Sequence, residues 1–193
     1  MKNQTAAAHN VSATANSANP TASVSLSEIV AARSRLNGAI NYTQCPESAA
    51  LSELTGARIF CKQEFLQRTG SFKERGARNA LAQLGPEVAR RGVIAASAGN
   101  HALSLAWHGR ALGIAVTVVM PRFAPLVKVA RCRQFGATVI LHGDTYDQAR
   151  SEADRLAAEH ISATSIPSMI RASSPGKASS PLKSSNKCLT PKP

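Results

Sequence analysis

From Gly92 onward, apolar and polar positions follow a pattern that predicts strands and helices in turn. Short apolar runs rich in β-branched residues are expected to form strands at 93–96, 115–120 and 137–141. Segments with helical spacing of apolar residues follow them at 101–112, 124–135 and 145–160. Strands that alternate with helices of this length form parallel sheets with right-handed crossovers. This part of the chain therefore predicts an α/β fold, with a parallel sheet and flanking helices.

At about residue 161 this pattern stops. Residues 161–193 consist mainly of Ser, Pro, Lys and Ala, a composition typical of a disordered tail. The helix expected at 145–160 should lead into a fourth parallel strand, but the only candidate, at 161–166, is weak and unconvincing. The abrupt change in composition suggests the hypothesis that 161–193 come from a frameshift or a misassigned gene end.

The first part of the chain is less regular. Residues 1–25 are rich in Ala, Ser, Asn and Thr, and lack the apolar core of a signal peptide, so we expect a flexible extension. Ser25 and Glu28 have the spacing of a capping box, which predicts a helix from Leu26 to Leu36. A short two-strand unit, joined at Thr55 and Gly56, is expected from 51–54 and 58–64.

A second capping-box spacing, Ser71 and Glu74, predicts a helix that begins at Ser71 and runs to about Leu84. Lys73 then lies in the first turn, where the positive end of the helix dipole disfavours another positive charge. Such a lysine should lose its proton more easily than a surface lysine, especially if it is buried. That suits an amine that attacks a carbonyl to form a Schiff base. The alternative is an ordinary lysine on an amphipathic helix.

The loop Ser97-Ala98-Gly99-Asn100-His101 follows one predicted strand and begins a helix. Backbone N–H groups converge at such a helix start, so the loop could receive a carboxylate or a phosphate. Gly99 would let a ligand approach the backbone closely. The loop also lies at the carboxyl end of a parallel strand, where open α/β sheets bind ligands. The same strand–glycine–helix turn is also a common structural device.

The formal net charge is +12, but it is unevenly distributed. Residues 1–160 contain 18 Lys and Arg against 11 Asp and Glu, whereas residues 161–193 contain five against none. A basic tail can bind nucleic acid or an anionic surface. This tail has no interleaved aromatic residues, no RGG pattern and no dense basic run. A nucleic-acid-associated protein is therefore kept only as a weak hypothesis, behind the two that are given at the end of this section.

The four cysteines lie far apart, without a C-x-x-C pair or a zinc-type spacing with histidine. They are interpreted as reduced thiols of a cytoplasmic protein, and we expect no metal site. No apolar run approaches the roughly 20 residues needed to span a bilayer, so no membrane association is expected.

Two linked motifs resemble the fold-type II pyridoxal-phosphate enzymes. They are Ser-Phe-Lys-Glu-Arg-Gly-Ala around Lys73 and Ala-Ser-Ala-Gly-Asn-His-Ala, in which Asn100 follows 27 positions after Lys73. Within that group the chain is most similar to threonine ammonia-lyase, also called threonine dehydratase, over about 26–160. The resemblance implies a tryptophan synthase β-like fold, here incomplete. It divides the chain into 1–25, an extension; 26–90, the N-terminal part of the large domain; 91–160, a small α/β domain; and 161–193, the tail.

The resemblance also implies roles for individual residues. Lys73 would hold pyridoxal 5'-phosphate as a Schiff base, Phe72 would pack near its ring, and Asn100 would hydrogen-bond the ring hydroxyl. The loop expected to bind the substrate carboxylate comprises Ser97, Gly99, Asn100 and His101. The implied reaction converts L-threonine, or serine, into a 2-oxo acid and ammonia; from threonine the acid is 2-oxobutanoate, as in isoleucine biosynthesis. Freed Lys73 would take the α-proton while hydroxide leaves the β-carbon.

One position refines the expected activity, and the length of the chain limits it. Related serine racemases have a serine where this chain has Ala98, and alanine cannot move a proton, so elimination is favoured over racemisation. Intact family members are longer, and we expect them to form homo-oligomers. They hold the cofactor phosphate with a glycine-rich loop that has no counterpart in this sequence. An impaired or inactive enzyme is therefore expected; the alternative is a non-catalytic fragment that pairs with full-length subunits. Cysteine-synthase and threonine-synthase relatives are less similar.

Overall fold

The computed structural model describes residues 24–159 and 164–165. The predicted extension up to residue 23 and the predicted tail from residue 166 lie outside the described residues. The helices are α1 (Leu26–Leu36), α2 (Ala49–Thr55), the 3-10 helix η1 (Glu64–Leu66), α3 (Lys73–Leu81), α4 (Pro86–Arg91), α5 (Asn100–Leu112), α6 (Leu126–Gln134) and α7 (Tyr146–Glu159). The strands are β1 (Val93–Ala96), β2 (Val116–Met120), β3 (Thr138–Leu141) and β4 (Thr164–Ser165).

The four strands form one parallel sheet in the order β3-β2-β1-β4, which confirms the predicted α/β fold. Within it Val93 pairs with Val116 on one side and with Thr164 on the other. The strand β4 lies inside the segment 161–166, where the sequence offered no convincing strand. That judgement was wrong, because the open edge of β1 pairs with a segment whose own sequence favours a strand only weakly.

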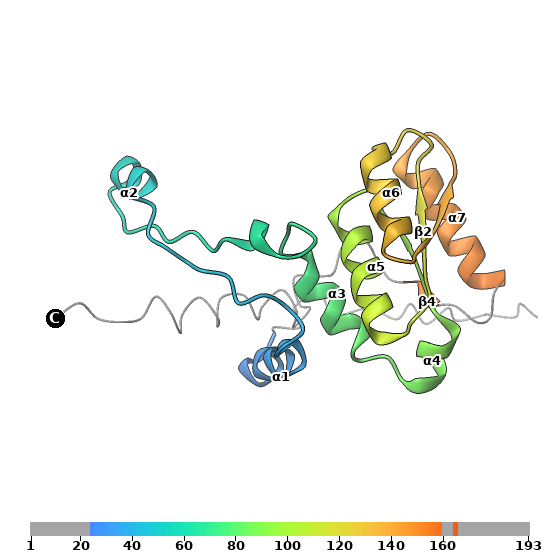
Figure 1. The fold of residues 1–193 in the computed structure, drawn as a ribbon, viewed down its shortest axis with the longest axis horizontal. Coiled ribbons are helices and arrows are strands. Elements are labelled where there is room, and N and C mark those ends of the chain that lie inside the picture. Colours follow the sequence, from blue (N-terminus) through green and yellow to red (C-terminus); the bar gives the residue numbers. More distant parts are fainter. Residues whose placement is uncertain (1–23, 160–163, 166–193) are drawn as a thin grey trace, which may run out of the picture.

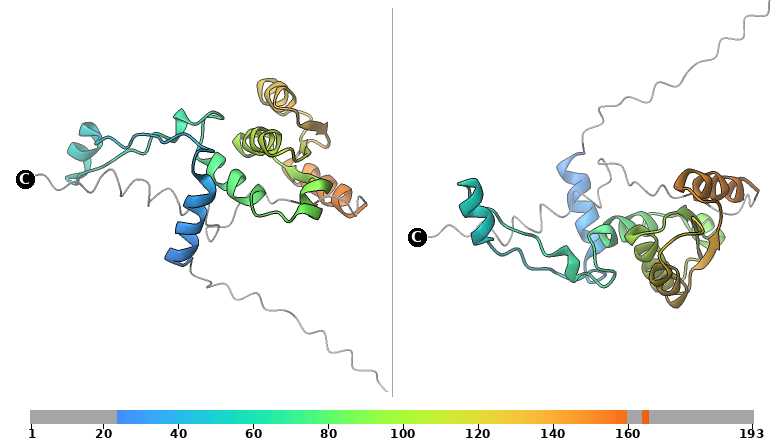
Figure 2. Two further views of the ribbon diagram at one scale, coloured as in Figure 1. Left: turned by 60° about the horizontal axis from the view of Figure 1, so that its bottom comes forward. Right: turned by 90° about the horizontal axis from the view of Figure 1, so that it is seen from above.

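Side chains alternate between the two faces of the sheet, and each face packs against different helices. Val118 and Met120 of β2 point into a core shared with α3, α5 and α6, whereas Val119 faces Ala149 and Ala153 of α7. Figures 1 and 2 show α5 and α6 on one side of the sheet and α7 on the other. Helix α3 packs along α5, so the candidate lysine helix is attached directly to the sheet domain.

The two-strand unit predicted at 51–64 is wrong. Residues 49–55 form α2, which begins at Ser48, whose hydroxyl accepts the Leu51 N–H, and ends at Gly56 with a positive φ of 67°. Ala, Leu and Glu favour a helix between two such end signals. The following residues are extended, but a single bridge, between Glu47 and Phe60, takes the place of the expected ladder.

The capping box at Ser25 is confirmed, but the one at Ser71 is wrong. Helix α3 begins after Phe72, not after Ser71, and ends at Leu81; the Ser71 hydroxyl accepts the N–H of Lys73 at 3.3 Å, but the reciprocal contact of the box is missing. The Glu74 carboxylate, which should bond the cap, instead accepts the N–H of Thr69 and faces the buried His108. These tertiary partners replaced the local ones. Helix α4, which starts with proline at its first position, was not predicted at all.

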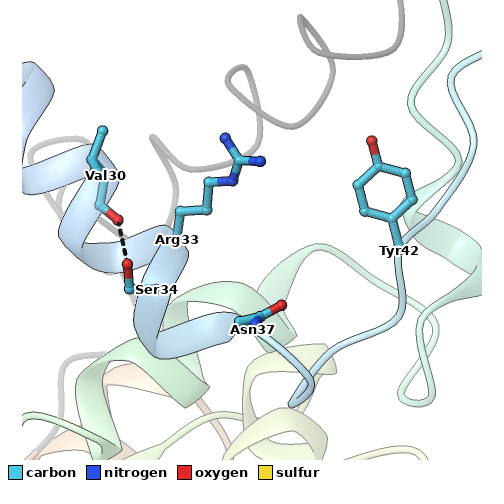
Figure 3. Close-up of a pocket in the computed structure, with 5 residues that line it drawn as sticks. All are labelled: Val30, Arg33, Ser34, Asn37 and Tyr42. Carbon is cyan, nitrogen blue, oxygen red and sulfur yellow. Dashed lines mark hydrogen bonds between the residues drawn. The ribbon is translucent and has the colours of Figure 1, made fainter.

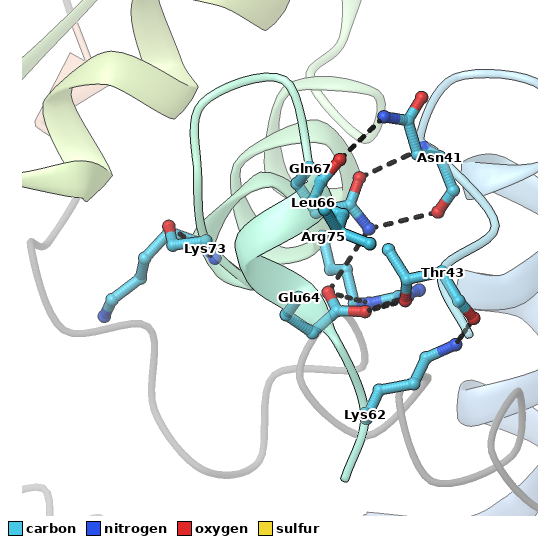
Figure 4. A network of polar contacts seen from close by, with 9 residues as sticks. Asn41, Thr43, Lys62, Glu64, Leu66, Gln67, Lys73 and Arg75 are labelled. Atoms are coloured by element: carbon cyan, nitrogen blue, oxygen red, sulfur yellow. Dashed lines mark hydrogen bonds and ion pairs between the residues drawn. The ribbon is translucent and has the colours of Figure 1, made fainter. Parts of the chain in front are cut away.

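Residues 41–66, which we call the arm, extend away from α1 and α3 and carry α2 at their far end (Figure 1). At the base of the arm, a buried polar network fastens it to α3 (Figure 4). Arg75 donates two hydrogen bonds to the Glu64 carboxylate, from Nε at 2.8 Å and from Nη2 at 2.7 Å. Glu64 also accepts the Thr43 hydroxyl at 2.7 Å. This network fixes the position of the chain that leads into Lys73.

Candidate functional site

Lys73 lies in the first turn of its helix, as the sequence predicted, and is the first residue of α3, so its backbone lies at the positive end of that helix dipole. The side chain is half-buried, and its Nζ lies 5.4 Å from the centroid of the Phe72 ring. It points away from the Glu64–Arg75 network (Figure 4). Phe72, with 44% of its surface exposed, lies beside the amine.

Glu74, the next residue, is fully buried and points to the opposite side, toward α5. Its Oε2 lies 3.4 Å from Nε2 of His108, and its Oε1 accepts the N–H of Thr69. Burial by itself raises the pKa of Glu74, but the close contact with the His108 ring and the hydrogen bond from Thr69 outweigh it and hold the pKa below its usual value. The carboxylate therefore stays charged and fastens the start of α3 to α5.

A second link joins the loop before Lys73 to the start of α5. The hydroxyls of Thr69 and Ser104 lie 3.0 Å apart, and Ser104 donates to the backbone carbonyl of Asn100 at 2.8 Å. Both contacts are buried or partly buried. Together with the Glu74 contact they place the N-terminal ends of α3 and α5, which carry Lys73 and Asn100, in one rigid arrangement.

The loop after β1 has the geometry that the sequence predicted. The Ser97 N–H donates to the Val119 carbonyl at 3.1 Å, so the loop stays attached to the sheet. Gly99 precedes the first residue of α5, and no side chain caps this helix start. The first N–H groups of a helix lack partners within it. A β-carbon placed on Gly99 would meet nothing within 4 Å, so the space beside these N–H groups is open.

The other predicted loop residues differ in exposure. His101 is buried, with 3% of its surface exposed, so it belongs more to the packing of α5 than to an open surface. Asn100 is half-buried, and its Oδ1 accepts a hydrogen bond from Lys128 Nζ at 2.6 Å. The structure thus brings together the residues of this loop and couples them to the Lys73 helix through the buried links.

Lys128 was missed by the sequence reasoning. It lies in the first turn of α6, which follows β2, and β2 is the neighbour of β1 in the sheet. Because the carboxyl ends of parallel strands meet at one edge, polar residues just after β2 are expected to meet those just after β1. Applying this rule to the segment after Met120 could have found Lys128.

A hollow of about 400 Å3 lies beside α1 (Figure 3). Its lining residues are Val30, Arg33, Ser34, Asn37 and Tyr42. None of the predicted site residues lines it.

Among the described residues no helix is long and apolar enough to cross a membrane, and no group of three or more His, Cys, Asp or Glu side chains is placed to hold a metal ion.

Comparisons with known proteins agree with the motifs. The family model described as "Pyridoxal-phosphate dependent enzyme" matches residues 36–174, well over half of the chain. The chain belongs to this family. Its members depend on pyridoxal phosphate, so the cofactor expected from the sequence is that of the family. The predicted resemblance to threonine ammonia-lyase, and with it the fold-type II architecture, is confirmed by the relatives described next.

Two curated relatives and one solved structure define the similarity. An L-threonine ammonia-lyase from Thermotoga maritima is 47% identical over 133 residues, which are 69% of this chain and 33% of that protein. An L-threo-3-hydroxyaspartate ammonia-lyase from a Pseudomonas species is 44% identical over 141 residues, 73% of this chain and 44% of that protein. A serine racemase structure from Dictyostelium discoideum is 31% identical with a TM-score of 0.79, and the match covers 86% of this chain and 54% of the other. The chain thus spans a third to less than half of these curated relatives.

The buried Glu74 gives this pyridoxal-phosphate family chain a testable dependence on pH. Glu74→Gln is expected to lower the free energy of unfolding at pH 7 by about 1.5–3 kcal/mol, the scale of a hydrogen bond to a charged group. Because the folded-state pKa of Glu74 is lowered, its contribution is present above the unfolded pKa and is lost as pH falls through the folded pKa. Urea unfolding should show the difference from wild type shrinking below about pH 4.

The matched control is Glu87→Gln, which changes an exposed carboxylate on α4 whose side chain is 73% exposed. It is expected to change the free energy of unfolding little at either pH. A Glu74→Gln difference that stays constant from pH 7 to pH 3 would contradict the role assigned to the charged form of Glu74.

Proposed function

We propose that this chain carries the lysine-bearing half of a pyridoxal-phosphate-dependent dehydratase site, which converts L-threonine, or L-serine, into a 2-oxo acid and ammonia. The observation that carries the proposal is the pairing of Lys73 at the start of α3 with the uncapped start of α5. This pairing occurs in a chain 47% identical to an L-threonine ammonia-lyase over the matched residues.

The residues present are chemically suited to hold the pyridine ring of the cofactor. Lys73 supplies an amine that is half-buried at a helix start, Phe72 supplies an aromatic face beside it, and Asn100 supplies an amide. The open space next to Gly99 leaves room for a carboxylate at the α5 N–H groups. When bound, pyridoxal phosphate supplies an electron sink for the electron pair left on the substrate α-carbon.

The roles of the chain's own residues follow from this arrangement. Nζ of Lys73 would hold the cofactor covalently, and, once displaced by the substrate amine, would take the α-proton. The N–H groups of Asn100 and His101, at the uncapped start of α5, would orient the carboxylate beside the loop 97–99, so that the α C–H bond faces Lys73. Ala98 has no group that moves a proton, which leaves Lys73 as the acid–base group and favours loss of the β-hydroxyl over racemisation. The threonine then yields 2-oxobutanoate and ammonia.

We expect the activity of this chain alone to be low. No two glycines are adjacent anywhere in the sequence, so no glycine-rich run is present to hold a phosphate. The chain also spans only 33% of the Thermotoga relative. Without contacts to its phosphate, the cofactor would be held only weakly at Lys73 and would dissociate readily into water.

The direct experiment is reduction with borohydride after incubation with pyridoxal phosphate, followed by mass mapping of the labelled peptide. The proposal expects the label on Lys73, with 2-oxo acid formed from L-threonine. Lys62 serves as an internal reference, because its amine donates to the Thr43 carbonyl at 2.5 Å. Label spread equally over Lys73, Lys62 and other lysines would contradict a cofactor site at Lys73.

A second candidate is a non-catalytic partner for a longer subunit of the same family. Exposed apolar side chains next to the site favour it: Phe123, Leu126 and Val127 are 82%, 83% and 63% exposed. Exposed apolar clusters of this kind often lie at protein contacts. Co-purification with a full-length threonine dehydratase, reduced by Leu126→Asp, would support this function, whereas purification of the chain alone would contradict it.

A further inference from the structure

The contact between Lys128 and Asn100 joins two loops that are distant in the sequence. Lys128 is the third residue of α6 and Asn100 the first residue of α5, and the helices follow the neighbouring strands β2 and β1. The lysine Nζ lies 2.6 Å from Asn100 Oδ1, and both side chains are half-buried. The contact therefore lies at the edge of the sheet where the candidate site is located.

The position of Lys128 is electrostatically unfavourable unless an anion is close. The first turn of a helix is the positive end of its dipole, and two such ends, of α5 and α6, lie around this ammonium group. A lysine there weakens the helix start that carries it. A negatively charged ligand beside Asn100 would offset this cost, because it would interact favourably with both helix ends and with the ammonium group.

The chemistry of the two groups fixes how the amide is oriented. An ammonium group donates hydrogen bonds but accepts none, so Lys128 can pair only with the oxygen of the Asn100 amide. The nitrogen Nδ2 is then held on the other side of the carboxamide, where it can act only as a donor. Without Lys128 the amide could turn by half a rotation and present its oxygen instead.

We propose that Lys128 is a positioning residue that holds the Asn100 amide with Nδ2 directed toward an anionic oxygen of the ligand. This inference rests on the proposed function for the identity of that ligand, pyridoxal phosphate, whose deprotonated ring hydroxyl would accept a hydrogen bond from Nδ2. Lys128 does not touch the reacting atoms. It acts through Asn100, and it adds positive charge that favours the deprotonated form of the ring hydroxyl.

The first test needs no ligand. In the full chain labelled with 15N, Lys128→Met is expected to move the side-chain amide resonances of Asn100, which are identified by their loss in Asn100→Asp. Lys62→Met is the matched control, since it removes an amine of the arm that also donates a hydrogen bond to a carbonyl oxygen. Circular dichroism establishes that each variant is folded. Unchanged Asn100 amide resonances in folded Lys128→Met overturn the proposal.

The second test measures binding of pyridoxal phosphate by visible absorbance, with its 3-O-methyl analogue as the matched ligand. Lys128→Met should weaken binding of pyridoxal phosphate about tenfold, the scale of one hydrogen bond to a charged group, and should hardly change that of the analogue. The midpoint for protonation of the bound chromophore should move to higher pH. Equal losses for both ligands, or no loss for either, overturn the proposal.

The failure of the proposed function is distinguishable from the failure of this inference. If wild type binds no pyridoxal phosphate at any concentration tested, the proposed function of the chain fails. The orientation of the Asn100 amide is then decided by the resonance test alone: altered resonances support the positioning role of Lys128, and unaltered ones overturn it.

Discussion

Replacing Lys73 by alanine is expected to abolish the visible absorbance that the wild-type chain gains with pyridoxal phosphate and to stop formation of 2-oxo acid from L-threonine. The reason is the loss of the only amine at the start of α3, since its neighbours Phe72 and Glu74 carry none. Any activity that wild type shows should fall by about 10³-fold or more, the scale for removal of a covalent catalyst. Absorbance titration and an assay of 2-oxo acid measure the two effects.

Lys73→Arg is the matched control for charge. Its guanidinium group keeps the positive charge at the helix start but stays protonated and does not form a covalent bond with an aldehyde. The same losses are therefore expected, with circular dichroism close to that of wild type, because the side chain at 73 is only half-buried. Equal cofactor uptake by wild type and both variants would refute catalysis through Lys73.

Arg75→Met is expected to lower the free energy of unfolding by about 3–5 kcal/mol, the scale for breaking a buried ion pair. The Arg75 side chain is 1% exposed and its Glu64 partner 12%, so the variant leaves a nearly buried carboxylate without its two charged donors. That is a large fraction of the roughly 5–15 kcal/mol by which a domain is ordinarily stable. Urea unfolding and limited proteolysis within residues 41–66 measure the loss of the network at the base of the arm.

The control for Arg75→Met uses an ion pair of the same type on the arm surface. Arg58 Nη2 lies 3.1 Å from Glu47, but the side chains are 64% and 39% exposed. Exposed pairs contribute between zero and about 1 kcal/mol, so Arg58→Met should change the stability little. Similar effects of the two substitutions would show that burial of the Arg75 pair does not govern its contribution.

The sheet could be predicted because its signals are local. β-Branched residues between helical segments, as at 116–120, specify strands wherever they lie, and the crossover rule then gives the parallel order. The strand at 164–165 was not predicted because its pairing with Val93 depends on an edge that only the folded sheet presents. The same limit explains why the capping box at Ser71 was predicted wrongly. The Glu74 carboxylate, which should bond Ser71, instead contacts His108 and accepts the N–H of Thr69, and these buried contacts form only in the folded protein.

The candidate site divides in the same way. Lys73 and the loop 97–101 could be found from motifs, since each depends on a few adjacent residues around a helix start. No local motif marks Lys128, because its contact with Asn100 spans 28 positions. Only the order of β1 and β2 in the sheet, combined with the rule for parallel sheets, points to it. The roles of Lys73, Phe72 and the loop residues remain predictions that the binding experiments address.

The position of the single tryptophan determines what fluorescence can report about this protein. Trp107 lies in α5, where its ring meets the ring of Phe135, the residue after α6, edge-on at 5.2 Å, and the Arg68 guanidinium lies 5.4 Å from the Trp107 ring centroid. Helix α2, in contrast, contains no buried residue. Segments with so few buried contacts open locally at low free energy, without unfolding of the core. Emission from Trp107 would therefore follow melting of the sheet domain and miss release of α2, so that one midpoint temperature would describe only part of the chain.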